Sequence, residues 1–248
     1  MSVFGEYAKF YDALYKDKDY MSEAKVVDSL LRKYGSDVKE VLVLGCGTGR
    51  HDRCLKQLGY QIHGIDMSED MIKEAKTAST DIEYEVCDIR DYKTDKKYDA
   101  VVSLFHVMSY QTTNDDIKKS MQTARSALKI GGILLFDVWY GPGVLTDRPY
   151  KRVKEVEWSD HRIIRTATPT MHPNENIVDV RYDFQISGIS NSETEDLTEV
   201  HHMRYFFKPE MNEYMLQTGF KMLDCIDCND LGEPDFDSWT AYFVAKPV

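Results

Sequence analysis

The sequence predicts an α/β protein with a doubly wound, mostly parallel β-sheet and a small antiparallel β insertion. Strand-like and helix-like segments alternate over residues 38–138, the first strand ends in a glycine-rich turn, and apolar and polar residues alternate strictly after about residue 150. Alternating strands and helices are typical of a parallel sheet with right-handed crossovers. Period-two alternation indicates half-buried antiparallel strands. We expect a ligand at the carboxyl ends of the parallel strands.

The elements of the parallel part follow from their apolar patterns. A helix is expected over residues 19–34, where apolar side chains share one face before Gly35. Ser68 is expected to cap a second helix, and Asn114 a third that ends at Gly131-Gly132. The expected parallel strands are residues 41–44, 61–65, 82–86, 100–104 and 133–138.

The second half of the chain has a different pattern. Residues 178–186 alternate apolar and polar side chains, and residues 162–168 and 200–207 are similar. A helix from Pro209 to Gly219 and strands at 221–227 and 239–245 are expected to return to the main sheet. We therefore expect one domain over residues 1–248 with an antiparallel insertion at about 150–207.

The net charge, the apolar runs and the cysteines indicate which classes of binding partner the protein can have. The formal net charge of −11 disfavours a nucleic-acid partner and favours a small-molecule substrate. The sequence shows neither a membrane-spanning apolar run nor a signal-peptide core, so we expect a cytoplasmic location and no membrane partner. Its five cysteines include one C-x-x-C pair, Cys225 and Cys228, without the second pair that a zinc site needs, so no metal is expected.

The segment VLVLGCGTGR carries the main chemical signal. Gly45, Gly47 and Gly49 form a G-x-G-x-G turn after the first strand, where glycine lets backbone amides approach a ligand. A dinucleotide loop would have glycine where Arg50 stands, which weakens a nicotinamide oxidoreductase as an alternative. Asp66 ends the second strand, the place of a carboxylate that binds ribose hydroxyls. These residues predict a nucleoside-containing cofactor, and a tight turn without a ligand is the alternative.

Four ordered segments resemble the class I S-adenosylmethionine-dependent methyltransferases: VLVLGCGTG, GIDMSEDMI, YEVCDIRDY and YDAVVSLFHVMSY. The resemblance implies a seven-stranded Rossmann-like methyltransferase fold, with S-adenosylmethionine as cofactor and S-adenosylhomocysteine as product. Asp88 as a turn cap and Met67 as a core residue are the alternative interpretations. The cofactor-binding residues that the resemblance implies are Gly45, Cys46, Gly47 and Gly49 for the methionine part, Asp66 for ribose, Met67, Asp88 and Ile89 for adenine, and Leu104 at the end of the fourth strand.

A narrower resemblance extends over nearly the whole chain. YDALYKDKDYMSEA, VVSLFHVMSY, FDVWYGP and HHMRYFF are similar to the N-methyltransferases of nucleotide-linked amino sugars, the desosamine and mycaminose type. In that group an aromatic N-terminal stretch covers the cofactor, which here implies Tyr11 and Tyr20. Tyr7, Tyr11 and Tyr15 share one face of a possible helix, a spacing that any amphipathic helix would also show.

The same resemblance points to the reacting end of the site. It implies that Tyr110 contacts the amine, and His106 is the alternative because its titration range suits a base, although backbone hydrogen bonds can also satisfy a histidine. Arg181 and Arg204 lie among apolar strand residues, where a charge needs a partner such as a diphosphate. Trp139 and Tyr140 are expected to wall the substrate site or to pack in the core.

The predicted function is N-methylation of a nucleotide-linked amino sugar. The alternatives are an O- or N-methyltransferase of another small metabolite and a non-catalytic S-adenosylmethionine-binding module. Methylation of a nucleic-acid base fits poorly, since those enzymes use an Asn/Asp-Pro-Pro-aromatic loop where this chain has Ser103-Leu104-Phe105-His106. A basic segment at residues 148–165 is read as a solvated strand face or as a diphosphate site. A homodimer is left open.

Overall fold

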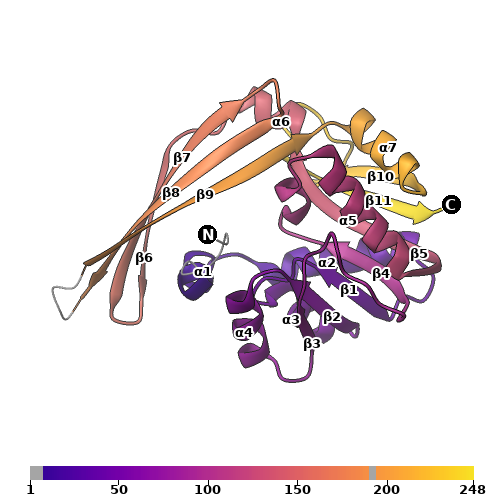
Figure 1. Ribbon diagram of the computed structural model, residues 1–248, viewed down its shortest axis with the longest axis horizontal. Helices are drawn as coiled ribbons and strands as arrows, with labels where there is room; N and C mark the ends of the chain where they lie inside the picture. Colours follow the sequence, from indigo (N-terminus) through magenta and orange to yellow (C-terminus); the bar gives the residue numbers. More distant parts are fainter. Residues whose placement is uncertain (1–7, 190–193) are drawn as a thin grey trace.

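The computed structural model describes residues 8–189 and 194–248. Helices and strands follow one another along the chain as drawn in Figure 1. The helical elements are α1 (Ala8–Leu14), α2 (Tyr20–Tyr34), α3 (Arg50–Gln57), α4 (Glu69–Ala78), the 3-10 turn η1 (Val107–Tyr110), α5 (Asn114–Ala127), α6 (Gly141–Thr146) and α7 (Lys208–Gln217). The strands are β1 (Glu40–Leu44), β2 (Gln61–Asp66), β3 (Glu83–Val86), β4 (Tyr98–Ser103), β5 (Leu128–Tyr140), β6 (Arg152–Trp158), β7 (His161–His172), β8 (Ile177–Gly188), β9 (Thr194–Phe206), β10 (Phe220–Asp227) and β11 (Thr240–Pro247).

Seven strands form the core sheet in the order β3-β2-β1-β4-β5-β11-β10. The first five are parallel to one another, and β11 runs antiparallel between β5 and β10. Val41 and Val43 pack toward α2, α3 and α4, while Leu42 and Leu44 pack toward α5 and α7. Helices on both faces explain why β1 is a continuous apolar run. The predicted doubly wound sheet is confirmed.

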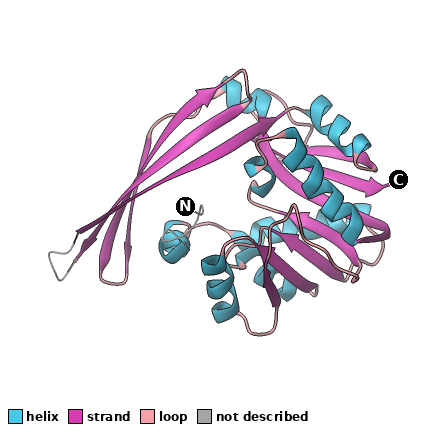
Figure 2. Ribbon diagram, viewed as in Figure 1, coloured by secondary structure: helices cyan, strands magenta, loops and turns pink. Residues whose placement is uncertain are grey.

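Strands β6 to β9 form an antiparallel sheet that extends away from the core as an arm (Figure 2). The arm joins the core where the end of β9 pairs parallel with the end of β5. The predicted antiparallel insertion is confirmed. It contains one further strand, β6, which lies in the basic segment 148–165 and was not predicted from the sequence.

Helix α1 packs against the arm rather than against the core sheet. Ala13 and Leu14 are buried with Val156, Ile163 and Phe184 of β6, β7 and β8. Figure 1 shows α1 in the angle between the arm and α4. This position brings the N-terminal tyrosines over the carboxyl ends of the parallel strands.

Two predicted helix boundaries are wrong. Thr113, not Asn114, caps α5, because its side chain accepts from the N–H of Asp116. The helix ends at Ala127, and Gly131-Gly132 lie inside β5, because the chain becomes extended at Leu128. The cap Ser68 and the helix start at Pro209 are as the sequence suggests, and Asp19 caps α2, the helix expected over residues 19–34. Within the two described ranges, no helix has the length and apolarity needed to cross a bilayer.

Candidate active site

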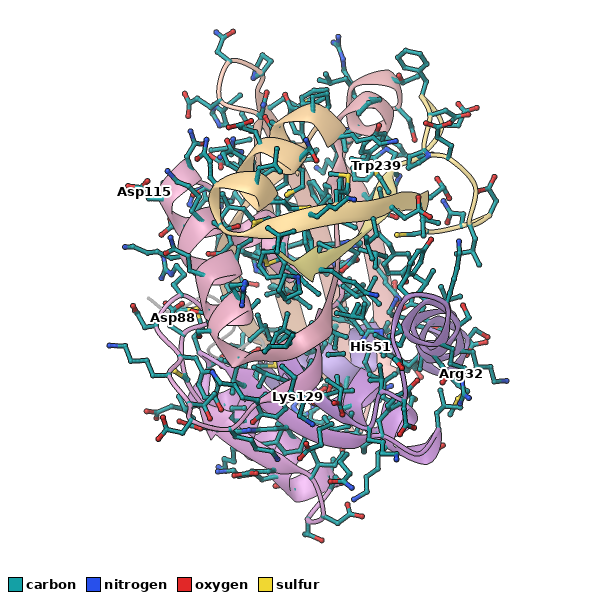
Figure 3. All side chains as sticks on the ribbon, turned by 90° about the vertical axis from the view of Figure 1, so that its right-hand side faces the viewer. Arg32, His51, Asp88, Asp115, Lys129 and Trp239 are labelled. Atoms are coloured by element: carbon teal, nitrogen blue, oxygen red, sulfur yellow. The ribbon has the colours of Figure 1, made fainter. Side chains whose placement is uncertain are left out.

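A cavity of about 470 Å³ opens at the carboxyl ends of β1, β2 and β4, where the sequence predicts the ligand. The arm and α1 close it from the opposite side, and Asp88 and His51, two of its lining residues, are labelled in Figure 3. The sequence-predicted residues that line it are Tyr11, Tyr20, Gly45, Cys46, Gly47, Asp66, Met67, Asp88, Ile89, Leu104, His106, Tyr110 and Trp139. The fold therefore brings most of the predicted cofactor residues together.

The glycine loop turns sharply between β1 and α3. Gly45, Gly47 and Gly49 have φ of 73°, 55° and 71°, a left-handed conformation that glycine adopts without strain. Gly47 lines the cavity, and a Cβ there would meet no protein atom within 4 Å. Gly49 does not line it, because a Cβ there would lie 2.2 Å from the Tyr84 hydroxyl beneath the loop. Gly49 therefore packs over Tyr84 and closes the turn, and its contact with the cofactor stays a prediction.

Asp66 connects the loop to the second strand. Its carboxylate accepts hydrogen bonds from the backbone N–H of Gly47 and of Ser68, each at 2.9 Å. Burial raises the pKa of this carboxyl, and the two backbone donors oppose that rise. Met67 beside it is 59% exposed, which rules out the core interpretation and leaves an apolar surface next to a carboxylate.

Asp88 has both of the roles that the sequence suggests. Its carboxylate caps a turn by accepting from the backbone N–H of Arg90 at 2.9 Å, and it also lines the cavity. The hydrogen bond from the Arg90 side chain lowers the pKa of Asp88. Ile89 is buried next to it. The pair offers an acceptor and an apolar wall, which suits an adenine edge.

Aromatic side chains cover the opposite side of the cavity. Tyr11 of α1 and Tyr15, which follows this helix, have ring centroids 4.8 Å apart, and both line the cavity. Tyr20 is buried, with its ring 4.8 Å from the His51 ring and 5.2 Å from the Arg50 guanidinium. Tyr7 lies outside the described residues.

Tyr110 is part of a network that the sequence analysis did not foresee. Its hydroxyl lies 2.7 Å from Nδ1 of His201, whose Nε2 lies 3.2 Å from Oε2 of Glu199. The His201 and Glu199 side chains are 3% and 11% exposed. Burial raises the pKa of Tyr110 well above its usual range, so this hydroxyl stays protonated.

His106 lines the same cavity from the loop after β4. Its Nδ1 lies 2.7 Å from Oδ2 of Asp137, and its backbone N–H donates to that carboxylate. Phe105 and His106 both have positive φ, of 63° and 65°, an uncommon conformation for such residues. His106 is thus held by a carboxylate at the edge of the cavity.

Three predicted substrate residues lie elsewhere. Tyr140, the last residue of β5, is buried in the core as the alternative interpretation expects, and it does not line the cavity. Arg181 is exposed and pairs with Asp183 at 2.9 Å. Arg204 is buried, where it donates to Asn114 at 2.9 Å and to Tyr214 at 3.0 Å. These assignments are corrected, because Arg204 joins β9 to α5 and α7 and Arg181 has a partner on its own strand.

One residue of the basic segment 148–165, Arg165, contacts tyrosines that line the cavity. Arg165 donates to the Tyr15 hydroxyl at 3.3 Å, and its guanidinium lies 5.0 Å from the centre of the Tyr182 ring. Arg162 pairs with Glu155 on the surface, as the solvated-face interpretation expects. Tyr15 and Tyr182 line the cavity, so Arg165 supports its aromatic wall.

The unforeseen lining residues come from the arm, from the start of α3, from the loop after β4 and from the turn after α1. They include Tyr15, Arg50, His51, Phe105, Tyr182, His201, His202 and Met203. A signal for His201 exists in the sequence, because Glu199 and His201 lie between Leu197 and Met203 on the same, largely apolar face of β9. Polar residues in such positions require partners.

Comparison with known proteins finds methyltransferases similar to parts of this chain. Residues 41–132 match the family model described as "Methyltransferase domain". The dTDP-3-amino-3,4,6-trideoxy-alpha-D-glucopyranose N,N-dimethyltransferase of Streptomyces venezuelae is 30% identical over 145 residues, 57% of this chain. The match spans 61% of that relative's length.

Solved structures share the fold over almost the entire chain. Streptomyces venezuelae DesVI is 21% identical with a TM-score of 0.83, over 99% of this chain and 100% of that one. The S-adenosylmethionine-bound CalS10 of Micromonospora echinaspora, an amino pentose methyltransferase, is 18% identical with a TM-score of 0.77, over 100% and 99%.

The residues present fit this cofactor. The open space at Gly47, the Asp66 carboxylate and the exposed Met67 are arranged as a methionine, ribose and adenine site would need. Residues 41–132 thus match a methyltransferase domain, and the residues that line the cavity fit S-adenosylmethionine as the cofactor.

Proposed function

We propose that the protein transfers a methyl group from S-adenosylmethionine to the amino group of a nucleotide-linked sugar. The observation that carries the proposal is the two-ended cavity. One end has the glycine loop, Asp66 and Asp88, and the other has the Tyr110–His201 pair beneath the arm. The relative from Streptomyces venezuelae, by its name, acts on such a substrate.

In the proposed reaction the protein mainly positions its two substrates. S-adenosylmethionine supplies an activated methyl group when it is bound. Gly45, Gly47 and Asp66 would hold it at the strand ends, and Tyr11 with Tyr20 would exclude water. Alignment of the reacting groups can supply about 7–11 kcal/mol of the rate acceleration.

The acceptor nitrogen must be neutral to react, so a group at the cavity must receive its proton. We assign the contact with the amine to Tyr110, with His106 as the alternative. Trp139 would wall the sugar, and Arg165 supports the tyrosines at the side where a nucleotide could lie. Because S-adenosylmethionine is a cytoplasmic metabolite, this function also supports the expected cytoplasmic location. The homodimer stays a prediction.

The test is incubation with methyl-labelled S-adenosylmethionine and a panel of nucleotide-linked amino sugars, followed by mass spectrometry. We expect one or two labelled methyl groups on the amine. Matched sugar nucleotides with a hydroxyl in place of the amine should stay unlabelled. Label on O-nucleophiles or on another metabolite would favour a different methyltransferase. Cofactor binding without transfer to any substrate would favour the non-catalytic module.

A further inference from the structure

The network behind Tyr110 joins two chain segments across the cavity. Tyr110 lies at the end of η1, whereas Glu199 and His201 lie on β9 of the arm. The contacts between Tyr110, His201 and Glu199 are 2.7 Å and 3.2 Å. All three residues meet beside the cavity that would hold the acceptor amine.

The chemistry of the three groups sets the direction of the hydrogen bonds. An ionised Glu199 can only accept, so Nε2 of His201 carries the proton and donates to it. Nδ1 of the neutral ring is then an acceptor, and it receives the Tyr110 O–H. Tyr110 lines the cavity, and its oxygen has a lone pair that can in turn accept a hydrogen from a substrate nitrogen.

We propose that His201 and Glu199 are positioning residues that let Tyr110 accept the proton of the substrate ammonium. This inference rests on the proposed N-methylation. As the ammonium gives its proton to the Tyr110 oxygen, the Tyr110 proton passes to Nδ1 of His201, and the resulting imidazolium is stabilised by Glu199. The freed nitrogen lone pair forms the new N–C bond while the methyl–sulfur bond breaks and leaves its electron pair on sulfur.

The surroundings of His201 are compatible with this role. The Tyr182 ring from β8 packs edge-on to the imidazole with centroids 4.8 Å apart. The other charged or titratable groups near the network are Asp66 of β2, Tyr182 of β8, Arg165 of β7 and Tyr15, which follows α1. Tyr15 and Arg165 contact each other and flank Tyr182. Within residues 8–189 and 194–248, the carboxylate of Glu199 lies 3.2 Å from Nε2 of His201.

The decisive variant is His201→Asn, whose amide oxygen can still accept the Tyr110 hydroxyl but cannot take up a proton. At pH 7 we expect kcat to fall about 10- to 100-fold, with the cofactor Kd and the KM for the amino sugar nearly unchanged. The deficit should shrink steadily toward pH 10, where the substrate amine is neutral before it binds. Glu199→Gln should show a smaller loss of the same shape. Glu195→Gln, an exposed residue of the same strand, is the matched control.

A loss that is equal at every pH, a loss confined to KM, or no loss would overturn the proposal. A second readout needs no turnover: nitrogen chemical shifts of His201 in the free protein should show a protonated Nε2 and an unprotonated Nδ1. The opposite tautomer would also overturn it. The proposed function fails separately, if the wild-type protein binds S-adenosylmethionine but methylates no amine at any pH.

Discussion

The Asp66 side chain holds the glycine loop in place and is also the residue expected to bind the ribose of the cofactor. It accepts hydrogen bonds from Gly47 and Ser68, so it holds the glycine loop and the start of α4 at fixed positions beside the cavity. A carboxylate held by two backbone donors is preorganised for a diol, because it does not have to change its conformation when the ligand arrives.

Asp66→Ala should weaken S-adenosylmethionine binding by about 1–3 kcal/mol, because the hydroxyl contacts and the loop contact are lost together. Calorimetric titration measures this change. Asp70→Ala, an exposed acid in the first turn of α4, is the control and should leave the affinity unchanged. Equal affinities of the Asp66 variant and the wild-type protein would contradict the ribose assignment.

Gly47 and Gly49 should respond differently to alanine, although both have positive φ. Gly49→Ala should lower the free energy of unfolding by about 2–4 kcal/mol, since the methyl group would collide with Tyr84 beneath the loop. Gly47→Ala should cost about 1–2 kcal/mol of stability from its backbone conformation alone, and should weaken cofactor binding because its methyl group would enter the cavity. Urea unfolding and calorimetry separate the two effects; identical behaviour of the variants would contradict the loop geometry.

Helix α1 is an element whose position depends on the arm. Its buried residues contact β6, β7 and β8, and its tyrosines face the cavity. Helix α1 and the arm therefore form one unit over the end of the cavity that contains Gly47 and Asp66, although more than 130 residues separate them in the sequence.

Leu14→Ala should loosen this unit, because Leu14 is fully buried between α1 and the arm and its truncation costs about 2–5 kcal/mol. Faster hydrogen exchange of the α1 amides and weaker cofactor binding are the expected results. Leu216→Ala, at a 54% exposed leucine of α7, is the control. If exchange in α1 stays at the wild-type rate, the helix is not held by this contact.

At the scale of the whole molecule, one buried acid links folding to pH. Asp52 is fully buried in α3 under the glycine loop, next to Gly64 and Tyr84. Burial raises the pKa of Asp52 to about 8 from its ordinary value of 3.8. Between these two values the folded protein keeps a proton that the unfolded chain releases, so rising pH favours the unfolded chain.

The free energy of unfolding should therefore fall by several kcal/mol from about pH 4 to about pH 8 through Asp52. Asp52→Asn mimics the protonated acid and should remove this dependence, so that the variant gains stability over the wild-type protein at pH 8 but not at pH 4. Urea unfolding at several pH values measures the difference. Parallel curves for the two proteins would show that Asp52 is ionised in the fold.

Local pattern was enough to predict much of the fold and the cofactor end of the site. The glycine loop, Asp66 and the parallel strands were predicted because each depends on neighbouring residues and on strand-end geometry. The end of the third helix was misplaced because Gly131 and Gly132 lie within β5 instead of after α5. Glycine spacing alone cannot distinguish a helix stop from a bend in a strand.

The sequence by itself determined where the cofactor end lies, since the strand that ends in glycines and the strand that ends in Asp66 are adjacent in any sheet of this type. Only the tertiary structure decided the opposite wall. Docking of the arm turned His201 and Glu199 toward Tyr110, and it turned Arg204 into a buried link to α5 and α7. Contacts between distant segments depend on how whole elements pack, and alternation within a strand shows which residues share a face but not what that face meets.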